Sequence, residues 1–193
     1  MKNGCQLEGY GARVCASGVQ NLTGFYSKKT TPVVLGQPFQ GGIVALIFNP
    51  EEKGWVAGEI HGLIAAKSDQ VPAKWESASR LSVTGATETA LGTGGTNTTK
   101  IVNAQKTSYL PSNAAKLCKD YNGGGFTDWY LPAKDELNLL YQNKAAIGGF
   151  SNDYYYSSSE TSLFSYWYLN FTNGQLINLV KSSNFKCRPV RLF

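Results

Sequence analysis

The stretch FTDWYLPAKDELNLLY, residues 126–141, carries the clearest local structural signal in the chain. Pro132 is a residue type preferred in the first turn of a helix. Asp135 and Glu136 follow in the opening turns, where the helix dipole favours acidic side chains. An apolar stripe at helical spacing comes next and consists of Leu137, Leu140 and Tyr141. The pattern predicts an amphipathic helix that begins at Pro132 and packs against a core.

The segment upstream predicts one more helix and a long loop. Residues 113–121 have a helical apolar stripe, with Ser112 as the expected N-cap and the NGGG sequence from Asn122 as the end. Residues 77–99 contain few large apolar groups and predict a surface loop. The GTGGTN sequence at 92–97 is expected to be part of that loop, since it lacks the Lys-Ser/Thr ending of a phosphate-binding loop.

Short strands are expected on both sides of these helices. The run GGIVALIF at residues 41–48 is typical of a buried strand, and residues 64–66 are its expected partner. Residues 154–193 predict several further strands. Pro189 places the last of them at a sheet edge or at a bulge, because proline cannot donate a backbone hydrogen bond to a neighbour.

A hairpin is expected at Asn173-Gly174, because both residues tolerate the positive φ of a two-residue turn. In that register Phe171 faces Leu176, and the two faces of the ribbon both carry apolar groups. We predict that one set of residues is core, namely Trp129, Leu137, Leu140, Trp167, Leu169 and Phe171. We predict that the opposite ribbon face stays substantially exposed, at Tyr168, Ile177 and Leu179.

Composition points to one domain and argues against two partner classes. The 193 residues are 42% hydrophobic and 16% charged, which suffices for one sizeable core. The net charge is +5, but the basic residues are scattered, so nucleic acid is not an expected partner. No apolar run is long enough to cross a bilayer, and the first 18 residues lack the apolar core of a secretory signal.

The cysteines and the single histidine do not indicate a metal site. Cys5, Cys15, Cys118 and Cys187 show no C-x-x-C spacing, so we expect no metal. Cys5 and Cys15 could close a small N-terminal loop, but buried free thiols are an equal alternative.

Catalytic residues are not expected either. His61, Ser68 and Asp69 are the residue types of a catalytic triad, yet their spacing does not establish its geometry. A structural histidine at the start of a strand explains His61 better. We therefore expect no catalytic residue, no enzyme activity and no cofactor.

Six segments, in continuous order over roughly residues 41–193, carry a family resemblance. They are GGIVALIF, HGLIAAKSDQ, GTGGTNTTKIV, LCKDYNGGGFTDWYLPAKDELNLLYQNKAAIGGF, YYYSSSE and RPVR. They resemble a bacterial and phage domain with the C-type lectin fold, which is also found at the C-terminus of bacterial collagen-like adhesins. The domain is similar to the variable proteins of diversity-generating retroelements, whose C-terminal segment is rewritten by reverse transcription with errors at template adenines.

The resemblance implies an α+β, C-type lectin-like fold, with two helices packed on short antiparallel strands and with long loops. The lectin-like domain would span residues 41–193, and residues 1–40 would be an N-terminal extension of the same globule. Tyr156 and Cys187 depart from the residue types that are usual in the family. A variable region would lie at about residues 154–191. Such a scaffold keeps its stability in the helices and the inward strand positions, so an outer face is free to vary.

The function that the resemblance implies is non-enzymatic binding of a ligand or receptor, a protein or a glycan, at a virion or cell surface. An asparagine codon whose adenines are randomised can encode the residue type found at most of the expected contact positions. It can also encode the valine at position 180. The implied ligand-binding residues are Tyr156, Ser162, Phe164, Ser165, Tyr168, Ile177, Asn178, Leu179, Ser182, Ser183 and Asn184.

The sequence leaves two alternatives open. An adhesin module for anionic glycans would use the basic residues Lys181, Lys186, Arg188 and Arg191. An oxidase is less expected: formylglycine-generating enzymes have a related fold but need two reactive cysteines in one cleft, and the sequence contexts of Cys118 and Cys187 do not resemble that motif.

Overall fold

The computed structural model describes residues 6–8, 12–15, 18–20, 32–51, 54–75, 83–105, 113–181 and 184–193. The chain divides into two compact units, Met1–Pro32 and Val33–Phe193. The first unit contains an antiparallel sheet formed by β1 (Gln6–Glu8), β2 (Ala12–Cys15) and β3 (Gly18–Gln20). Cys5, and with it the expected loop to Cys15, lies outside the described residues. That residues 1–40 belong to the globule of the lectin-like domain stays a prediction.

The second unit contains a four-stranded antiparallel sheet in the order β12-β6-β5-β4. Its strands are β4 (Pro38–Phe39), β5 (Gly42–Ile47), β6 (Gly62–Ala65) and β12 (Val190–Leu192). Val44 of β5 pairs with Ile64 of β6, so the expected strand partnership is confirmed. β12 lies at the edge of this sheet, as Pro189 predicted.

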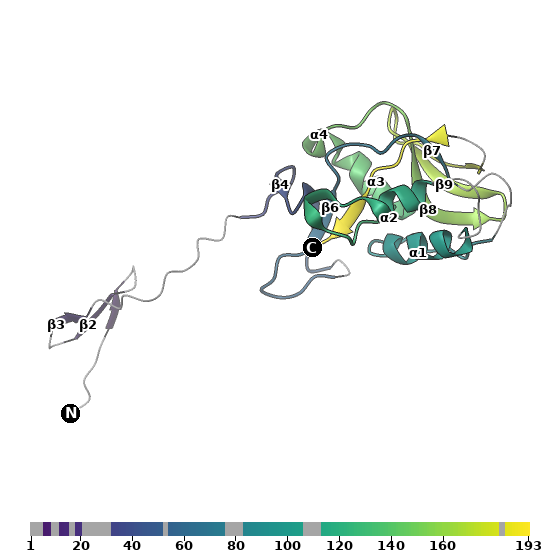
Figure 1. Ribbon diagram of the computed structural model, residues 1–193. Coiled ribbons are helices and arrows are strands. Elements are labelled where there is room, and N and C mark those ends of the chain that lie inside the picture. Colours follow the sequence, from purple (N-terminus) through teal and green to yellow (C-terminus); the bar gives the residue numbers. More distant parts are fainter. Residues whose placement is uncertain are drawn as a thin grey trace. The chain divides into compact units, whose positions relative to one another are not determined.

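Four α-helices lie in the described part of the second unit (Figure 1). They are α1 (Gly94–Ala104), α2 (Ala114–Asp120), α3 (Lys134–Gln142) and α4 (Lys144–Ile147), and a short 3-10 turn, η1, spans Gly123–Gly125. Both helices expected from the sequence are present with shorter bounds. α2 is capped by the Asn113 side chain, which accepts a hydrogen bond from the Lys116 amide at 2.8 Å. The expected cap, Ser112, lies outside the described residues.

α3 begins two residues later than predicted. Pro132 and Ala133 precede it, and the Ala133 backbone is still extended, with φ −66° and ψ 169°. The Glu136 carboxylate folds back and accepts the Ala133 amide proton at 2.7 Å, so the first turn starts after Ala133.

α1 overturns the prediction that the GTGGTN sequence is part of a flexible loop. Its Gly and Thr residues have low helix propensity, and only tertiary contacts hold the helix in place. The Thr98 hydroxyl donates a hydrogen bond to the Leu131 carbonyl at 3.3 Å and accepts one from the Leu131 amide at 3.0 Å. Asn97 donates to the Glu88 carbonyl at 2.6 Å. Buried polar side chains, Asn97 and Thr98, lie beside the single fully buried apolar residue Ile101, so the helix lacks the longer apolar stripe that a sequence pattern would detect.

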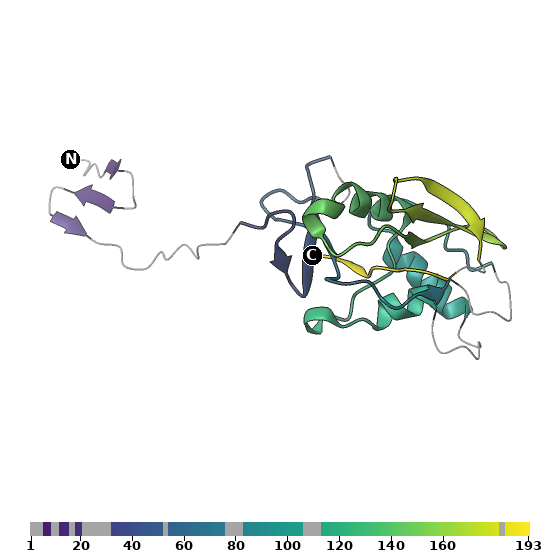
Figure 2. The same cartoon turned by 90° about the horizontal axis from the view of Figure 1, so that it is seen from above.

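A three-stranded antiparallel sheet, in the order β10-β9-β8, lies at the end of the second unit opposite to β4 and the C-terminal residue (Figure 2). Its strands are β8 (Tyr154–Ser162), β9 (Ser165–Asn170) and β10 (Leu176–Val180). A small two-stranded sheet of β7 (Ala73–Lys74) and β11 (Asn184–Phe185) completes the unit.

The register expected for the β9–β10 hairpin was wrong by two residues. Leu176 pairs with Leu169 rather than with Phe171. The connection is a four-residue loop, in which the Gly174 amide donates to the Asn170 carbonyl at 2.8 Å. Gly174 has a φ of 78°, and a Cβ there would lie 2.5 Å from the Tyr141 ring. Because the shift is two residues, each side chain keeps the ribbon face that was expected for it.

Both faces of this sheet are apolar because two separate core clusters cover them. α1 and α3 both contact β8 (Figure 1). The first cluster includes Leu137 and Leu140 of α3 together with Tyr155, Leu169 and Phe171. The second includes Trp75, Ile101, Cys118, Tyr156, Tyr166 and Tyr168. The neighbours Tyr155 and Tyr156 therefore belong to opposite clusters.

The predicted burial is correct for most of the expected core residues and incorrect for three residues of the hairpin. Trp129, Leu137, Leu140, Leu169 and Phe171 are buried, as predicted. Tyr168 was predicted to be exposed, but only 2% of it is, because its ring lies in the second core cluster. Ile177 is half-buried against the same cluster. Trp167 was predicted to be core but is half-buried, with the Lys134 ammonium 5.6 Å from its ring centroid.

Candidate functional site

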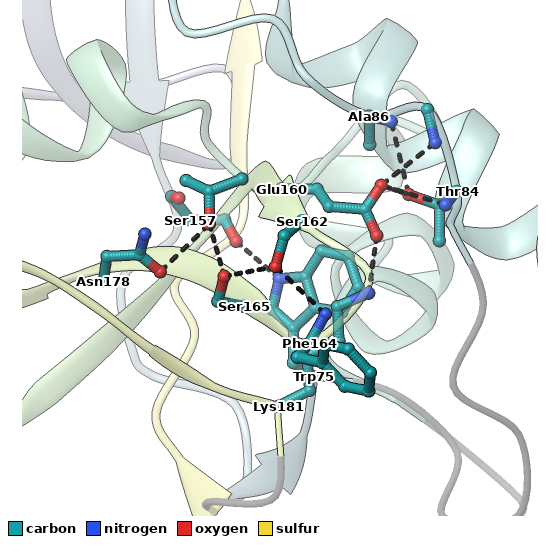
Figure 3. Close-up of polar contacts among 12 residues, drawn as sticks. Trp75, Thr84, Ala86, Ser157, Glu160, Ser162, Phe164, Ser165, Asn178 and Lys181 are labelled. Carbon is teal, nitrogen blue, oxygen red and sulfur yellow. Dashed lines mark hydrogen bonds and ion pairs between the residues drawn. The ribbon is translucent and has the colours of Figure 1, made fainter.

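The tip of the β8–β9 hairpin presents an uncharged, hydrogen-bonded group of side chains (Figure 3). The Ser165 hydroxyl lies 2.7 Å from the hydroxyls of both Thr161 and Ser162. Thr161 also donates to the Asn178 side-chain oxygen at 3.0 Å, which joins the hairpin to β10. Beside these polar groups the Phe164 side chain is 53% exposed. The tip therefore offers an exposed ring next to hydroxyl and amide groups.

Val180 extends this surface along β10. It pairs with Ser165 across the strands and is 54% exposed. We call the following residues the tip surface: Thr161, Ser162, Phe164, Ser165, Asn178 and Val180.

Irregular pairing sets the shape of the tip. The β8–β9 register shifts between Tyr156 and Glu160, and again between Glu160 and Ser162. Extra residues on one strand bend it and change the direction in which its side chains point. As a result, Glu160 points inward while Thr161 and Ser162 remain exposed.

A buried ion pair lies beneath the tip surface. The Lys181 ammonium is 2.5 Å from the Glu160 carboxylate, and only 1% of each side chain is exposed. The second Glu160 oxygen accepts the amide protons of Thr84 at 2.9 Å and Gly85 at 3.0 Å (Figure 3). The Lys181 ammonium also lies 4.7 Å from the centroid of the Trp75 ring. A buried charge pair is tolerated when hydrogen bonds satisfy its remaining groups, as they do here.

This ion pair connects three segments that are distant in sequence. Glu160 is in β8, Lys181 directly follows β10, and the loop at residues 83–86 supplies the amide donors. The Lys181 amide donates to the Phe164 carbonyl at 3.0 Å. The backbone that carries the Phe164 ring is thus tied to the buried charge pair.

The structure brings together four of the expected contact residues and separates the others. Ser162, Phe164, Ser165 and Asn178 meet in the tip surface. Asn184 is exposed but pairs with Lys74 in the small β7–β11 sheet. Ser182, Ser183 and the side chain of Leu179 lie outside the described residues. Sequence reasoning missed Thr161, whose position in a run of small polar residues gave no distinguishing signal.

Tyr156 and Tyr168 belong to an aromatic cluster in the interior. Their rings pack with Tyr166 and Phe185, at centroid distances of 5.1–6.1 Å. Burial raises the pKa of Tyr156 to about 12, and burial, followed by the neighbouring Tyr154, raises the pKa of Tyr168. The phenols stay neutral at physiological pH, so they pack as core groups.

The basic residues considered for anionic glycans are all paired with carboxylates. These residues are Lys181, Lys186, Arg188 and Arg191. Lys181 pairs with Glu160, as described above. Arg188 contacts Asp69 at 2.6 Å, and Lys186 lies 3.7 Å from the same carboxylate. Arg191 makes two bonds to Asp128, at 2.7 and 2.8 Å, and lowers the pKa of that carboxyl. Three carboxylates balance three of these four positive charges, and the cations Lys181 and Arg188 are buried, so the four do not form one exposed basic patch.

Two of the triad-type residues, His61 and Asp69, make structural contacts with different partners. The His61 ring bonds the Phe193 carbonyl at 3.0 Å and Glu59 at 2.8 Å, at the start of β6. Asp69 accepts from the Tyr155 hydroxyl at 2.6 Å and from Arg188. In the described ranges no group of three His, Cys, Asp or Glu residues could hold a metal ion. None of the helices described has the length and apolar character of a membrane span.

Helices packed on both faces of short antiparallel strands, in a mixed α+β arrangement, form a C-type lectin-like domain. The family model of the Lcl C-terminal domain matches residues 68–191, more than half of the chain. The chain therefore belongs to the Lcl C-terminal domain family, a lectin-like family of binding domains. No curated protein matches the sequence.

Proposed function

We propose that this chain is a non-enzymatic ligand-binding protein that contacts its ligand through the tip surface. The observation that carries the proposal is the exposed Phe164 ring beside an uncharged hydroxyl and amide network, on a backbone tied to a buried ion pair. A rigid ring contributes contact area with little loss of rotamer entropy, and Ser, Thr and Asn contribute adaptable hydrogen bonds.

The separation of buried from exposed side chains along β9 and β10 supports the assignment of the tip surface as the contact site. Tyr166 and Tyr168 of β9 are buried in the second cluster, and Leu169 on the opposite face is buried in the first, whereas Val180 at the tip end of that face is 54% exposed. Stability therefore resides in the buried positions of both faces, and substitutions confined to the tip surface have small effects on folding. Such a surface can change its ligand without loss of the fold.

We further propose that the chain is the variable protein of a diversity-generating retroelement, displayed on a virion or a cell surface. The tip surface lies within the variable region expected at about residues 154–191, and most of its side chains are reachable from randomised asparagine codons. The flanking DNA tests this directly. A near-copy of the last coding segment, differing mainly at adenines and adjoining a reverse transcriptase gene, is the expected result, and its absence would contradict diversification.

Binding itself is tested with labelled protein on glycan arrays and on panels of bacterial cells. A Phe164→Ser, Val180→Ser double variant should lose the signals that the wild-type chain gives. Ile60→Ser is the matched control, because Ile60 is 54% exposed but lies in the loop before β6, outside the tip surface. Equal loss in the control, or an unchanged signal in the double variant, would contradict the assignment of the site.

A further inference from the structure

Two cysteines that are far apart in sequence meet inside the second core cluster. Cys118 is in α2, and Cys187 lies between β11 and β12. Both are free thiols with no exposed surface, both belong to the second core cluster, and the Cys187 thiol is close enough to influence the pKa of the Cys118 thiol. The sequence contexts of the two residues gave no sign of this pairing.

The backbone around the pair is held from both sides. The Cys187 carbonyl accepts the Gln70 amide proton at 2.9 Å, and the preceding Lys186 carbonyl accepts that of Tyr156 at 2.9 Å. These bonds fix the C-terminal segment to β8 through Tyr156 and to the loop between β6 and β7 through Gln70. On the other side, Ala114 and Ala115 of α2 are buried in the same cluster as Cys118. The two thiols therefore sit where the helix meets the C-terminal segment.

The folded environment protects these thiols from reaction. Burial, followed by the hydrogen bond to Cys187, raises the pKa of the Cys118 thiol well above its ordinary value. Because the thiolate is the reactive form, and because neither sulfur is exposed, an external oxidant has little access to the pair once the chain is folded.

We propose that Cys118 and Cys187 form a redox-dependent cross-link that is set during folding. In an oxidising medium they close a disulfide, and in a reducing medium they remain as two protected thiols. The bond would join α2 to the segment that leads into the edge strand β12. It would close a loop of roughly 70 residues, and such loops restrict the unfolded chain.

The oxidant is a small disulfide such as oxidised glutathione. One cysteine thiolate attacks its S–S bond, forms a mixed disulfide and releases one glutathione thiolate. The second cysteine thiolate then attacks the mixed disulfide and releases the other. One S–S bond breaks and one forms; two electrons pass to glutathione, and the two cysteine protons end on the two glutathione thiols.

The test refolds the full chain in parallel, with a mixture of reduced and oxidised glutathione or with excess reductant. Trypsin places Cys118 in the peptide 117–119 and Cys187 in the peptide 187–191. After oxidative refolding we expect these peptides to be linked in a non-reducing mass spectrum. We expect the melting midpoint to rise by about 5–15 °C relative to the reduced protein. Free thiols at both positions, or a link from either to Cys5 or Cys15, would overturn the proposal.

Two controls separate the cross-link from other effects of oxidation. In the first control, Cys187→Ala and Cys118→Ala are each refolded under both conditions. The melting midpoints of the oxidised and the reduced protein should then be equal, and a difference that persists in both variants would contradict the proposal. In the second control, oxidised glutathione is added to protein that has already folded in reductant. We expect no linked peptide within the time that oxidative refolding needs to link all of the protein. Rapid linkage of the folded protein would show that the thiols are not protected.

Discussion

Glu160 and Lys181 meet through a 2.5 Å contact beneath the tip surface, and both side chains are almost fully buried. Removal of one partner from a buried pair leaves an uncompensated charge in the interior. We expect Glu160→Gln to lower the free energy of unfolding by about 3–5 kcal/mol in urea denaturation. Replacing both residues by apolar ones, as in Glu160→Leu with Lys181→Met, should cost less than the sum of the single changes.

The chain offers a matched control for this pair. Lys116 and Asp120 of α2 are also 2.5 Å apart, but about half of each side chain is exposed. Water screens such a pair, so Asp120→Asn should cost less than about 1 kcal/mol. Equal costs for Glu160→Gln and Asp120→Asn would show that the inner pair is not desolvated.

Phe164 and Tyr168 provide a second matched comparison, because both are aromatic and both lie near the tip. Phe164→Ser should change the free energy of unfolding by no more than about 0.5 kcal/mol, since the ring is 53% exposed. Tyr168→Ser should cost about 3–5 kcal/mol, comparable with other large-to-small core changes, because only 2% of the residue is exposed. A severe loss with Phe164→Ser would mean that this ring is part of the core.

Gly174 is expected to resist substitution for two reasons. Its φ of 78° is unfavourable for other residues, and a Cβ would meet the Tyr141 ring at 2.5 Å. Gly125 has a similar φ of 79°, but a Cβ there would have no neighbour within 4 Å. Gly125→Ala should cost about 1–2 kcal/mol from the backbone alone, and Gly174→Ala should cost more. Equal shifts in thermal midpoint would contradict the contact with Tyr141.

His61 should titrate above the ordinary histidine pKa of 6.5. The hydrogen bond to Glu59 is the main cause, and the Phe193 carbonyl adds to it. A raised folded-state pKa gives stability that is fully present below pH 6.5 and is lost as the pH rises through the folded value. Because the chain has one histidine, an NMR titration reads this pKa without ambiguity. Glu59→Gln should bring it down towards 6.5, and an unchanged value would rule out Glu59 as the cause.

The sequence predicted well those elements whose signal is local or periodic. The apolar run at residues 41–48, the stripe of Leu137 and Leu140, and the edge position implied by Pro189 depend on backbone chemistry and spacing alone. α1 could not be predicted in this way, because buried hydrogen bonds of Asn97 and Thr98 hold it against distant segments.

The candidate site was predictable only in part. Ser162, Phe164, Ser165 and Asn178 were expected contact residues and do meet at the tip. The burial of Tyr168 was not predictable, since a period of two residues separates the ribbon faces but does not say which face the second core cluster covers. The partnership of Glu160 with Lys181 depends on bulges that alternation does not encode.

The tip surface, as we propose, can bind different ligands without loss of the fold. Selection from two displayed libraries of equal size against one purified protein, hen lysozyme, tests this proposal. One library randomises Ser162, Phe164, Ser165, Asn178 and Val180. The other randomises Val34, Leu35, Val56, Ile60 and Val71, which are exposed but lie outside the tip surface. We predict that the tip library yields folded binders with melting midpoints close to that of the parent chain, whereas the second library yields none. Unfolding of most tip variants, or equal yields from both libraries, would contradict the claim.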